Sequence, residues 1–394
     1  MPRRMLFIVL GLLALLHLYI GMRLLPDSGA NAAGVAAGVV LLAASTLLVP
    51  TGLLGSRIKR WRYADQLTWV ALLAMGFFSS LLVLTVARDV ALGVLHLLAA
   101  ATPAFVKSSA IGVPALALGV TLVGLVNARR VARVVRVEVP IRDLPPALQG
   151  YTIVQISDVH VGPTIKRGYL NAIVTKVNAL DADAVAITGD LVDGSVKHLR
   201  LHTEPLARLT ARDGAFFVTG NHEYYSGADE WIAEMRRLGV TVLLNQHVLC
   251  RRGDDTLLLA GVTDFTAHLF NPSHKSDPVA ALRGAPKSVG ARILLAHQPR
   301  SAAAAADAGF DLQLSGHTHG GQFFPWNLFV PLQQPFTSGL NRLRDMWVYT
   351  SRGTGYWGPP KRFGAPSEIT CVRLVSAKIG ATRADALLLE PPEK

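Results

Sequence analysis

The chain has 394 residues, of which 51% are hydrophobic and 17% are charged, and its formal net charge is +12. The length predicts two or more domains, and the apolar content is too high for an ordinary soluble protein, so part of the chain is expected in a lipid bilayer. Most of the positive charge, +10, lies in residues 1–136 beside apolar stretches. This distribution indicates membrane flanks and excludes a basic nucleic-acid groove.

Four apolar stretches near the amino terminus are long enough to cross a bilayer, namely 5–25, 32–54, 66–87 and 110–126. We expect the first to be retained as a helix, although Ala30-Asn31-Ala32 imitates a signal-peptide cleavage site. Residues 91–105, which include Pro103, are expected to form a re-entrant or surface segment. The four stretches contain no Asp or Glu, which argues against a transporter. Residues 1–130 are therefore predicted to be a membrane domain.

Basic residues in the short loops predict the orientation of this domain, since Lys and Arg stay on the cytoplasmic side. Two basic clusters are expected there, Arg57, Lys59, Arg60 and Arg62, and Arg129, Arg130, Arg133 and Arg136. In the opposite loops, acidic residues accompany the bases, as in Arg23 with Asp27 and Arg88 with Asp89. We therefore predict a multi-pass protein of the inner or plasma membrane, with everything after residue 130 in the cytoplasm.

A soluble domain is predicted for residues 151–394, after a linker at 131–150 that contains Pro145-Pro146. Its first half alternates strands with helices, with strands at 152–156, 184–188 and 215–219 and helices at 170–179, 199–211 and 229–238. Closely spaced strands follow, at 242–250, 256–262, 293–296, 312–314, 346–351 and 369–374. An Ala-rich helix is expected at 301–308. The pattern predicts an α/β fold with a second, mixed sheet.

Polar clusters follow five of the predicted strands, and they carry residue types that bind metal ions. They are Asp158 and His160, Asp190, Asn221 with His222 and Glu223, His297, and His317 with His319. Asp158 and His160 are one residue apart, so both side chains can leave the same side of an extended backbone. The two oxygens of Asp190 can bridge two cations, and the amide oxygen of Asn221 adds a ligand without adding charge.

An isolated His-Thr-His pair would more often pack on one face of a strand than bind a metal ion. Five such clusters, all at strand ends, are not explained by packing and indicate a metal site. Mixed Asp, Asn and His ligands suit Mn, Fe or Zn better than Ca or Mg.

The order of the motifs, Asp-x-His, Gly-Asp, Gly-Asn-His-Glu, His and Gly-His-x-His, resembles the calcineurin-like metallophosphoesterase superfamily over roughly residues 150–374. Residues 351–358 and 366–369 resemble its membrane-associated branch, which also has multi-span amino-terminal regions. The resemblance implies a four-layer α/β/β/α sandwich of two mixed sheets that holds two metal ions. One ion would be bound by Asp158, His160, Asp190 and His319, and the other by Asp190, Asn221, His297 and His317.

The two divalent ions, with manganese expected and iron or zinc as alternatives, would clamp a phosphoryl group and activate water for in-line attack on phosphorus. His222 adjoins the ligand Asn221 and is expected to protonate the leaving oxygen or to stabilise its charge. In similar phosphatases an Asp three residues after the bridging one orients this His, and Asp193 holds that position here. Asp193 is equally well explained as a turn residue before Gly194.

Arg352, Tyr224 and Tyr225 could contact substrate, and Arg352 and Tyr224 are the favoured candidates. Arg352 could equally form a surface ion pair, and Tyr224, which is followed by a second tyrosine, could equally be a packing residue. Histidines outside the motifs are expected to be structural or exposed. Cys250 and Cys371 lack a metal-type spacing, which suits buried thiols in a reducing compartment.

These features predict a membrane-anchored, metal-dependent phosphoesterase that cleaves a phosphodiester or pyrophosphate bond of a lipid-linked or membrane-proximal substrate. One alternative is hydrolysis of the pyrophosphate of UDP-2,3-diacylglucosamine in lipid A synthesis, which some similar enzymes perform. Another is a non-catalytic receptor or scaffold that uses the fold only to bind a ligand, which the complete ligand set disfavours. Neither a nucleic-acid partner nor an obligate protein partner is expected.

The stretch 323–332, directly after the His-Thr-His motif, is apolar, and its two prolines prevent a regular helix or central strand. Such a segment could form a hydrophobic wall between the metals and the bilayer and accept acyl chains. It could equally fill the space beneath a long loop as ordinary core.

Overall fold

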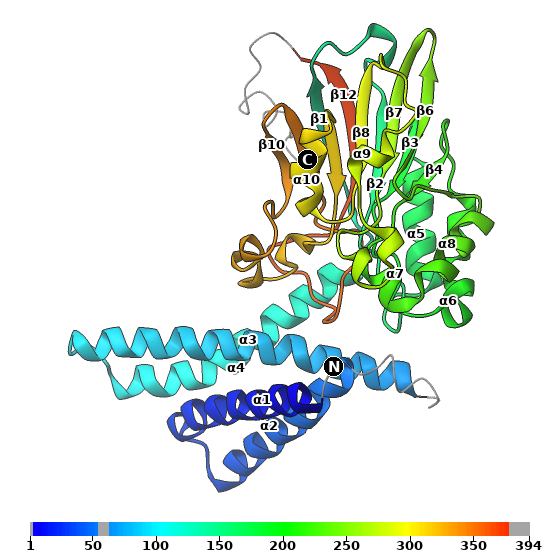
Figure 1. Ribbon diagram of the computed structural model, residues 1–394. Coiled ribbons are helices and arrows are strands. Elements are labelled where there is room, and N and C mark those ends of the chain that lie inside the picture. The colour runs from blue at the N-terminus through cyan, green and yellow to red at the C-terminus, as the bar shows by residue number, and fades with distance from the viewer. Residues whose placement is uncertain (1–2, 54–62, 378–394) are drawn as a thin grey trace. The chain divides into compact units, whose positions relative to one another are not determined.

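The structure, a computed structural model, describes residues 3–53 and 63–377 (Figure 1). Its internal contacts divide the chain into two units. The helical unit comprises residues 1–129 and 358–363, and the α/β unit comprises residues 130–357 and 364–394. The basic cluster at 57–62, which supports the predicted orientation, lies outside the described residues.

In the described residues, the helical unit contains four long helices, α1 (Arg3–Leu24), α2 (Ala32–Leu53), α3 (Ala64–Leu97) and α4 (Pro103–Arg129). Each is long and apolar enough to cross a membrane. The prediction of a separate re-entrant or surface segment at 91–105 is wrong, because residues up to Leu97 continue α3 and Pro103 begins α4. Proline fits the first turn of a helix, where its missing N–H removes no intrahelical hydrogen bond, so Pro103 marks a start rather than a break.

The charged residues expected in loops opposite the basic clusters meet within the helical unit. Arg88 is buried in α3 and donates hydrogen bonds to a carboxylate oxygen of Asp27 over 2.6 Å and to the carbonyl oxygen of Arg23 over 3.0 Å. Asp89 accepts hydrogen bonds from Tyr19 at 2.7 Å and from Arg23 at 2.8 Å. Arg88 and Asp89 are therefore helical rather than loop residues, and their charge-assisted hydrogen bonds stabilise the packing of α3 against the end of α1.

Within residues 63–377, the α/β unit contains two six-stranded sheets. The first has the order β1-β12-β2-β3-β4-β5, with β1 (Arg133–Ile141), β2 (Thr152–Ile156), β3 (Ala184–Ile187), β4 (Ala215–Phe217), β5 (Thr241–Val242) and β12 (Glu368–Ser376). The second has the order β10-β11-β9-β8-β7-β6, with β6 (Gln246–Arg252), β7 (Asp255–Gly261), β8 (Ala291–Leu295), β9 (Leu312–Ser315), β10 (Gly339–Leu343) and β11 (Met346–Thr350). Both sheets are mixed, since each combines a parallel centre with antiparallel pairs.

Helices cover the outer faces of the two sheets (Figure 1). On one side lie α5 (Arg167–Asn178), α6 (Val196–Thr203) and α8 (Ala228–Arg237), and on the other lie α9 (Pro278–Ala281) and α10 (Ala302–Asp307). In α8 the buried residues Trp231, Ile232 and Met235 recur at helical spacing, so this helix presents one apolar side to its neighbours. The predicted four-layer α/β/β/α sandwich of two mixed sheets is confirmed.

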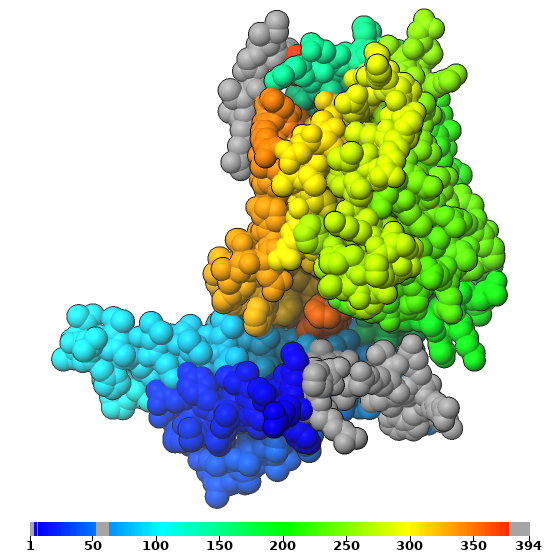
Figure 2. All heavy atoms as spheres, in the orientation of Figure 1, coloured from blue at the N-terminus to red at the C-terminus, as the bar shows by residue number. Residues whose placement is uncertain are grey.

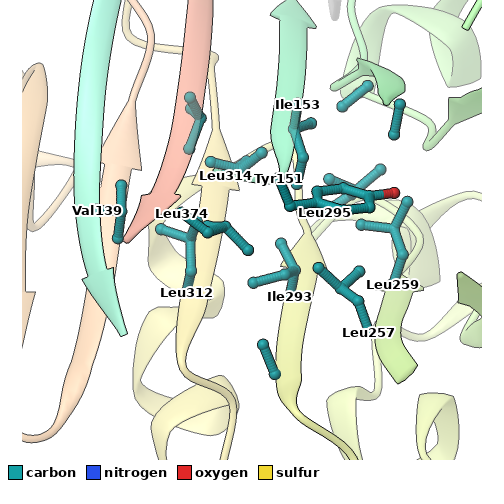
Figure 3. Close-up of a cluster of buried hydrophobic side chains, with 14 of the residues drawn as sticks. Val139, Tyr151, Ile153, Leu257, Leu259, Ile293, Leu295, Leu312, Leu314 and Leu374 are labelled. Carbon is teal, nitrogen blue, oxygen red and sulfur yellow. The ribbon is translucent and has the colours of Figure 1, made fainter. Parts of the chain in front are cut away.

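The main hydrophobic core lies between the two sheets (Figure 3). Its members include Val139, Ile153 and Leu374 from the first sheet and Leu257, Leu259, Ile293, Leu295, Leu312 and Leu314 from the second. Alternate residues of each strand face this core, as the two-residue period of a strand requires. Each buried aliphatic side chain contributes about 1.5–3 kcal/mol to the free energy of unfolding. Cys250 packs in this core as a free thiol, whereas Cys371, also a free thiol, is only half-buried.

The interval 131–150, predicted to be a linker, contains strand β1, so that prediction is corrected. β1 pairs in parallel with β12 over its whole length. Its alternating valines favour an extended backbone, and Pro140 is tolerated because β1 is an edge strand. Only residues 130–132 therefore separate α4 from the first strand of the α/β unit.

The single strand predicted at 242–250 is also corrected, because the chain forms two strands in different sheets. Val242 ends β5 in the first sheet, and Gln246 begins β6 in the second. Between them Asn245 has a φ of 55°, a left-handed conformation that asparagine adopts more readily than most other residues. The apolar run therefore crosses from one sheet to the other.

Candidate active site

The seven candidate metal ligands lie just beyond the carboxyl ends of parallel strands in both sheets. The loops after β2 and β3 carry Asp158, His160 and Asp190, and Asn221 begins the short helix that follows β4. The segments after β8 and β9 carry His297, His317 and His319. Carboxyl ends of parallel strands meet at one edge of a sheet, where open α/β sheets bind their ligands. Packing of the two sheets brings both sets of loops to the same place.

Asp158, His160 and His319 form the first ligand cluster, in which one donor atom of each residue lies within 4.8 Å of the others. The Nε2 atoms of His160 and His319 are 3.1 Å apart, and Nε2 of His319 is 3.5 Å from Oδ1 of Asp158. All three residues are buried. The structure thus brings together three of the four ligands expected for the first ion.

Asp190, His297 and His317 form the second ligand cluster, again within 4.8 Å. Nε2 of His297 is 3.1 Å from Oδ2 of Asp190 and 3.1 Å from Nδ1 of His317. Nδ1 of His297 is 2.8 Å from the carbonyl oxygen of Thr188, a hydrogen bond that fixes the ring with Nε2 towards Asp190. Oδ2 of Asp190 is also 3.9 Å from Nε2 of His160, so it lies between the two clusters, where a bridging ligand is needed.

The chemistry of the donor atoms fits two divalent ions. Oδ1 of Asn221 is buried and, among the described residues, has no hydrogen-bond partner. An amide oxygen left in this way costs about 1–3 kcal/mol unless another group, such as a cation, binds it. Carboxylate oxygens, an amide oxygen and imidazole nitrogens together form a ligand set that Mn, Fe and Zn accept.

Most of the candidate ligands have backbone conformations that residues other than glycine rarely adopt. Positive φ angles, between 50° and 71°, occur at Asp158, His160, Asp190, His317 and His319. Such conformations cost about 1–3 kcal/mol each and persist only where the surrounding structure enforces them. Their concentration on these loops supports a function that requires the side chains to converge.

Two glycines explain how ligand loops from different strands approach so closely. A Cβ atom on Gly220 would collide with the carboxylate and the amide nitrogen of Asp190. A Cβ atom on Gly316 would collide with the carboxylate of Asp158. In both cases the next residue along the chain is a candidate ligand, so the glycines in the motifs provide the space that the ligand arrangement needs.

Asp193 contacts both His222 and one of the ligand histidines. Its Oδ1 atom is 2.6 Å from Nδ1 of His222 and 3.0 Å from Nδ1 of His160. The carboxylate therefore orients two rings. The expected contact with His222 is present, so Asp193 is more than a turn residue before Gly194. Burial lowers the pKa of His222, but the carboxylates of Asp190 and Asp193 outweigh burial and raise this pKa to about 9. The Asp193 carboxylate thus favours the protonated ring, which is the form that a general acid requires.

Glu223 is a positioning residue whose role the sequence reasoning missed. Its side chain is fully buried and accepts hydrogen bonds from the backbone N–H groups of Gly220 at 2.6 Å, Asp190 at 3.0 Å and Leu191 at 2.8 Å. These bonds fasten the loop after β3 to the loop after β4. Its position in the sequence could have indicated this role. A glutamate at the third residue of a helix, here α7 (Asn221–Ser226), typically accepts a hydrogen bond from the backbone N–H of the residue before the helix.

Arg352, the first predicted substrate contact, packs beside the loop that carries the His-Thr-His motif. A Cβ atom on Gly320 would lie 3.0 Å from Cγ of Arg352. Nη1 of Arg352 is 3.3 Å from Oε2 of the buried Glu368, so the alternative of an ion pair is present in the structure. The side chain is still 38% exposed, which leaves part of the guanidinium at the surface next to the site.

Tyr224, the second predicted substrate contact, is buried. Its hydroxyl group lies 2.9 Å from Nδ1 of His274. The neighbouring Tyr225 is 62% exposed, and its ring packs against that of His222 with the centroids 5.2 Å apart. Tyr225 is therefore better placed than Tyr224 to contact a substrate. The difference between the two tyrosines comes from the different directions in which their rings point.

The apolar segment 323–332 lies at the surface of the α/β unit (Figure 2). Exposed fractions between 45% and 79% occur at Phe324, Trp326, Leu328, Phe329 and Leu332. Gly321 lies so close to Asn327 that a Cβ atom there would collide with the Asn327 backbone, so the segment folds directly against the His-Thr-His loop. The alternative that these side chains are ordinary core is wrong except at Phe323, which is buried.

Comparison with known proteins identifies relatives of this chain. The family model of calcineurin-like phosphoesterases matches residues 151–321. A "Transmembrane protein with metallophosphoesterase domain" from Danio rerio is 42% identical over 274 residues, which cover 66% of this chain and 62% of that protein. A relative of the same description from Bos taurus is 42% identical over 279 residues, covering 67% of this chain and 63% of that protein.

The chain thus spans less than two thirds of the length of these two vertebrate relatives. An uncharacterized metallophosphoesterase from Aquifex aeolicus is 32% identical over 227 residues, which cover 56% of this chain and 84% of that protein. The four apolar helices and the transmembrane relatives together make this a membrane protein. The resemblance inferred from the motifs is confirmed, and the chain belongs to the calcineurin-like metallophosphoesterase family.

Proposed function

We propose that this protein is a membrane-anchored phosphoesterase that uses two divalent ions to cleave a phosphodiester or pyrophosphate bond of a lipid-linked, membrane-proximal substrate. The observation that carries the proposal is the convergence of two ligand clusters on either side of Oδ2 of Asp190. A protein that only bound a ligand would not need His222 held by Asp193 beside those clusters.

In this proposal the first ligand cluster would hold one ion, the second ligand cluster with Asn221 would hold the other, and Asp190 would contribute to both sites. Bound there, two divalent ions, preferably manganese, would supply Lewis acidity and lower the pKa of water towards neutrality. His222 donates the proton on Nε2 to the leaving oxygen, while Asp193 holds the opposite nitrogen and stabilises the charged ring. Arg352 and Tyr225 are the side chains at the rim that can contact the rest of the substrate.

Exposed apolar side chains beside the ligand clusters support a lipid-linked substrate. The apolar segment 323–332 lies against the His-Thr-His loop, and a second set lies around His222. The rings of Tyr225 and Trp357 are 5.2 Å and 5.6 Å from the His222 ring, and Phe270 packs on Tyr225. Clusters of exposed apolar side chains mark sites that bind ligands or membranes. The short connection at 130–132 ties the α/β unit to a helix that can span a bilayer.

Replacing Trp326 and Phe329 with serine tests the substrate class. The variant should raise KM for a diacyl phosphodiester about tenfold or more, because each buried methylene contributes ~0.8 kcal/mol and 1.4 kcal/mol corresponds to a factor of ten. KM for a small chromogenic phosphodiester should stay nearly unchanged. Both substrates are assayed with the purified full-length protein and Mn²⁺.

Val279→Ser is the control, because Val279 is an exposed apolar residue that lies on α9, outside the segment 323–332. Equal effects of the double substitution on both substrates would remove the case for a lipid-linked substrate. Failure of the wild-type protein to hydrolyse either substrate with any of Mn²⁺, Fe²⁺ or Zn²⁺ would contradict the proposed function itself.

We further propose that the α/β unit lies in the cytoplasm and that the protein resides in the inner or plasma membrane. The basic residues 129–136, directly after α4, support this orientation by the positive-inside rule. A reporter enzyme that is active only in the cytoplasm should be active when fused after Lys394. Activity there of a reporter that works only outside the cytoplasm would reverse the topology.

A further inference from the structure

The segment Gly358–Phe363 belongs to the helical unit, although the residues on both sides of it belong to the α/β unit. Its backbone is hydrogen-bonded to α4 at two points. The amide N–H of Arg362 donates to the carbonyl oxygen of Gly124 at 2.9 Å, and the side-chain amide of Asn127 donates to the carbonyl oxygen of Arg362 at 3.3 Å. A short segment that interrupts the α/β unit along the chain thus packs within the helical unit.

Lys361 anchors this segment between two helices. Its side chain is buried, and its ammonium group donates hydrogen bonds to the carbonyl oxygen of Gly76 at 2.9 Å, to the hydroxyl of Ser80, and to the hydroxyl of Thr121 at 3.3 Å. Gly76 and Ser80 are on α3 and Thr121 is on α4, so a single side chain joins the two helices. Burial of a charged group is costly unless it is well hydrogen-bonded, and an ammonium group has three N–H donors to place.

Two glycines leave the space that this segment occupies. A Cβ atom on Gly124 would lie 2.6 Å from Cγ of Lys361, which is closer than atoms of real side chains approach. A Cβ atom on Gly76 would lie 3.3 Å from Cβ of Pro359, a tight contact. The facing surfaces of α3 and α4 are therefore shaped to receive residues 358–363.

The residues on either side of this segment, Trp357 and Gly364, belong to the α/β unit and are hydrogen-bonded there to the loop that follows the His-Thr-His motif. The amide N–H of Trp357 donates to Oε1 of Gln322 at 2.9 Å, and Nε2 of Gln322 donates to the carbonyl oxygen of Trp357 at 2.8 Å. At the other end, Gly364 pairs with Phe323 as an isolated antiparallel bridge. The ring of Trp357 packs against that of His222, with the ring planes at 77°.

We propose that Lys361 is a positioning residue for the phosphoesterase site, because its docking between α3 and α4 fixes residues 358–363 and thereby holds Trp357 against His222. The inference rests on the proposed function, in which His222 is the proton donor. It makes the packing of α3 on α4 a determinant of catalysis, so the membrane helices do more than anchor the enzyme. A displacement of about 1 Å at a reacting group costs up to 10²-fold in rate, which gives such positioning a measurable effect.

Hydrogen–deuterium exchange tests the docking without any assay of activity. Lys361→Met keeps a long, unbranched side chain but removes the ammonium group and with it all of its hydrogen bonds. In the full-length protein, it should speed exchange at least tenfold at the amide of Trp357 and in the peptide that contains Gln322 and Phe323. Lys107→Met is the matched control, since Lys107 is an exposed lysine on α4, and it should change neither peptide.

Kinetics test whether the docking acts through His222. Lys361→Met should lower kcat about tenfold or more, with little change in KM, for a phosphodiester whose leaving group needs a proton. The loss of kcat should be much smaller for a leaving group that needs no proton. The same dependence on the leaving group is expected for His222→Ala. Trp357→Ala should show the same pattern, and combining the two substitutions should add little. A general loss of folding would instead lower kcat equally for both leaving groups.

Each outcome decides one of the two proposals. Unchanged exchange at Trp357, or a loss of kcat that is the same for both leaving groups, would overturn the role of Lys361. Faster exchange in a protein that hydrolyses neither phosphodiester would leave the docking in place and overturn the proposed function instead. If Lys361→Met does not fold, Ser80→Ala removes a single acceptor and should produce the same pattern with a smaller effect.

Discussion

Asp190→Asn is expected to lower phosphodiester hydrolysis by more than the ~10–100-fold that a change in an outer-shell partner of a metal site typically causes. Oδ2 of Asp190 lies 3.1 Å from Nε2 of His297 and 3.9 Å from Nε2 of His160, so its charge is shared by both ligand clusters. An amide in its place removes that charge and weakens the binding of both ions. Metal content of the purified protein, measured by mass spectrometry beside kcat, should fall at both positions.

Asp345→Asn is the control for this substitution, because the Asp345 carboxylate is 80% exposed and pairs with Arg142 at the surface. It should leave metal content and kcat unchanged. A chelator should abolish the activity of the wild-type protein, and added Mn²⁺ should restore it. Full activity of Asp190→Asn, or of chelator-treated protein, would mean that the reaction does not use two metal ions.

His222→Ala is expected to lower kcat by a factor of ~10²–10⁴ while leaving metal content near normal. The structure supports this separation, because Nδ1 of His222 is occupied by Asp193 at 2.6 Å and Nε2 is 3.9 Å from the nearer oxygen of Asp190. A proton donor matters only when the leaving group needs a proton. A phosphodiester with an acidic phenol as leaving group should therefore recover much of the lost rate.

His198→Ala provides the comparison, since His198 is an exposed residue of α6 whose ring bonds to Ser195. It should behave like the wild-type protein with both leaving groups. Loss of metal ions from His222→Ala would make this residue a ligand rather than an acid. A loss of rate that does not depend on the leaving group would also remove it as the proton donor.

Local chemistry explains why the candidate ligands were found from the sequence. A metal ion requires particular donor atoms, and a close approach between loops requires glycine, so Gly220 and Gly316 recur directly before ligand-type residues. The strands that precede these motifs are short apolar runs buried on both sides, and such runs are visible without any knowledge of their partners. The order of the motifs then pointed to the family and its fold.

The sequence mispredicts those segments whose secondary structure or burial depends on a partner that is distant along the chain. Residues 133–141 form a strand because β12, more than two hundred residues later, offers them an edge. The run 242–250 breaks at Asn245 because its two ends pair in different sheets. The two tyrosines after His222 look alike in sequence, but burial against His274 removes Tyr224 from the surface and leaves Tyr225 there.

The sequence by itself determined the apolar helices, the residue types of the metal site and the family, because each of these is written in neighbouring residues and their spacing. Only the tertiary structure decided that Asp193 holds two rings, that Glu223 joins two loops, and that Lys361 lies between α3 and α4. Lys361 and Ser80 are separated by 281 positions along the chain. A hydrogen bond over that separation depends on how distant helices pack, and nothing in the residues next to Lys361 along the chain records its partners.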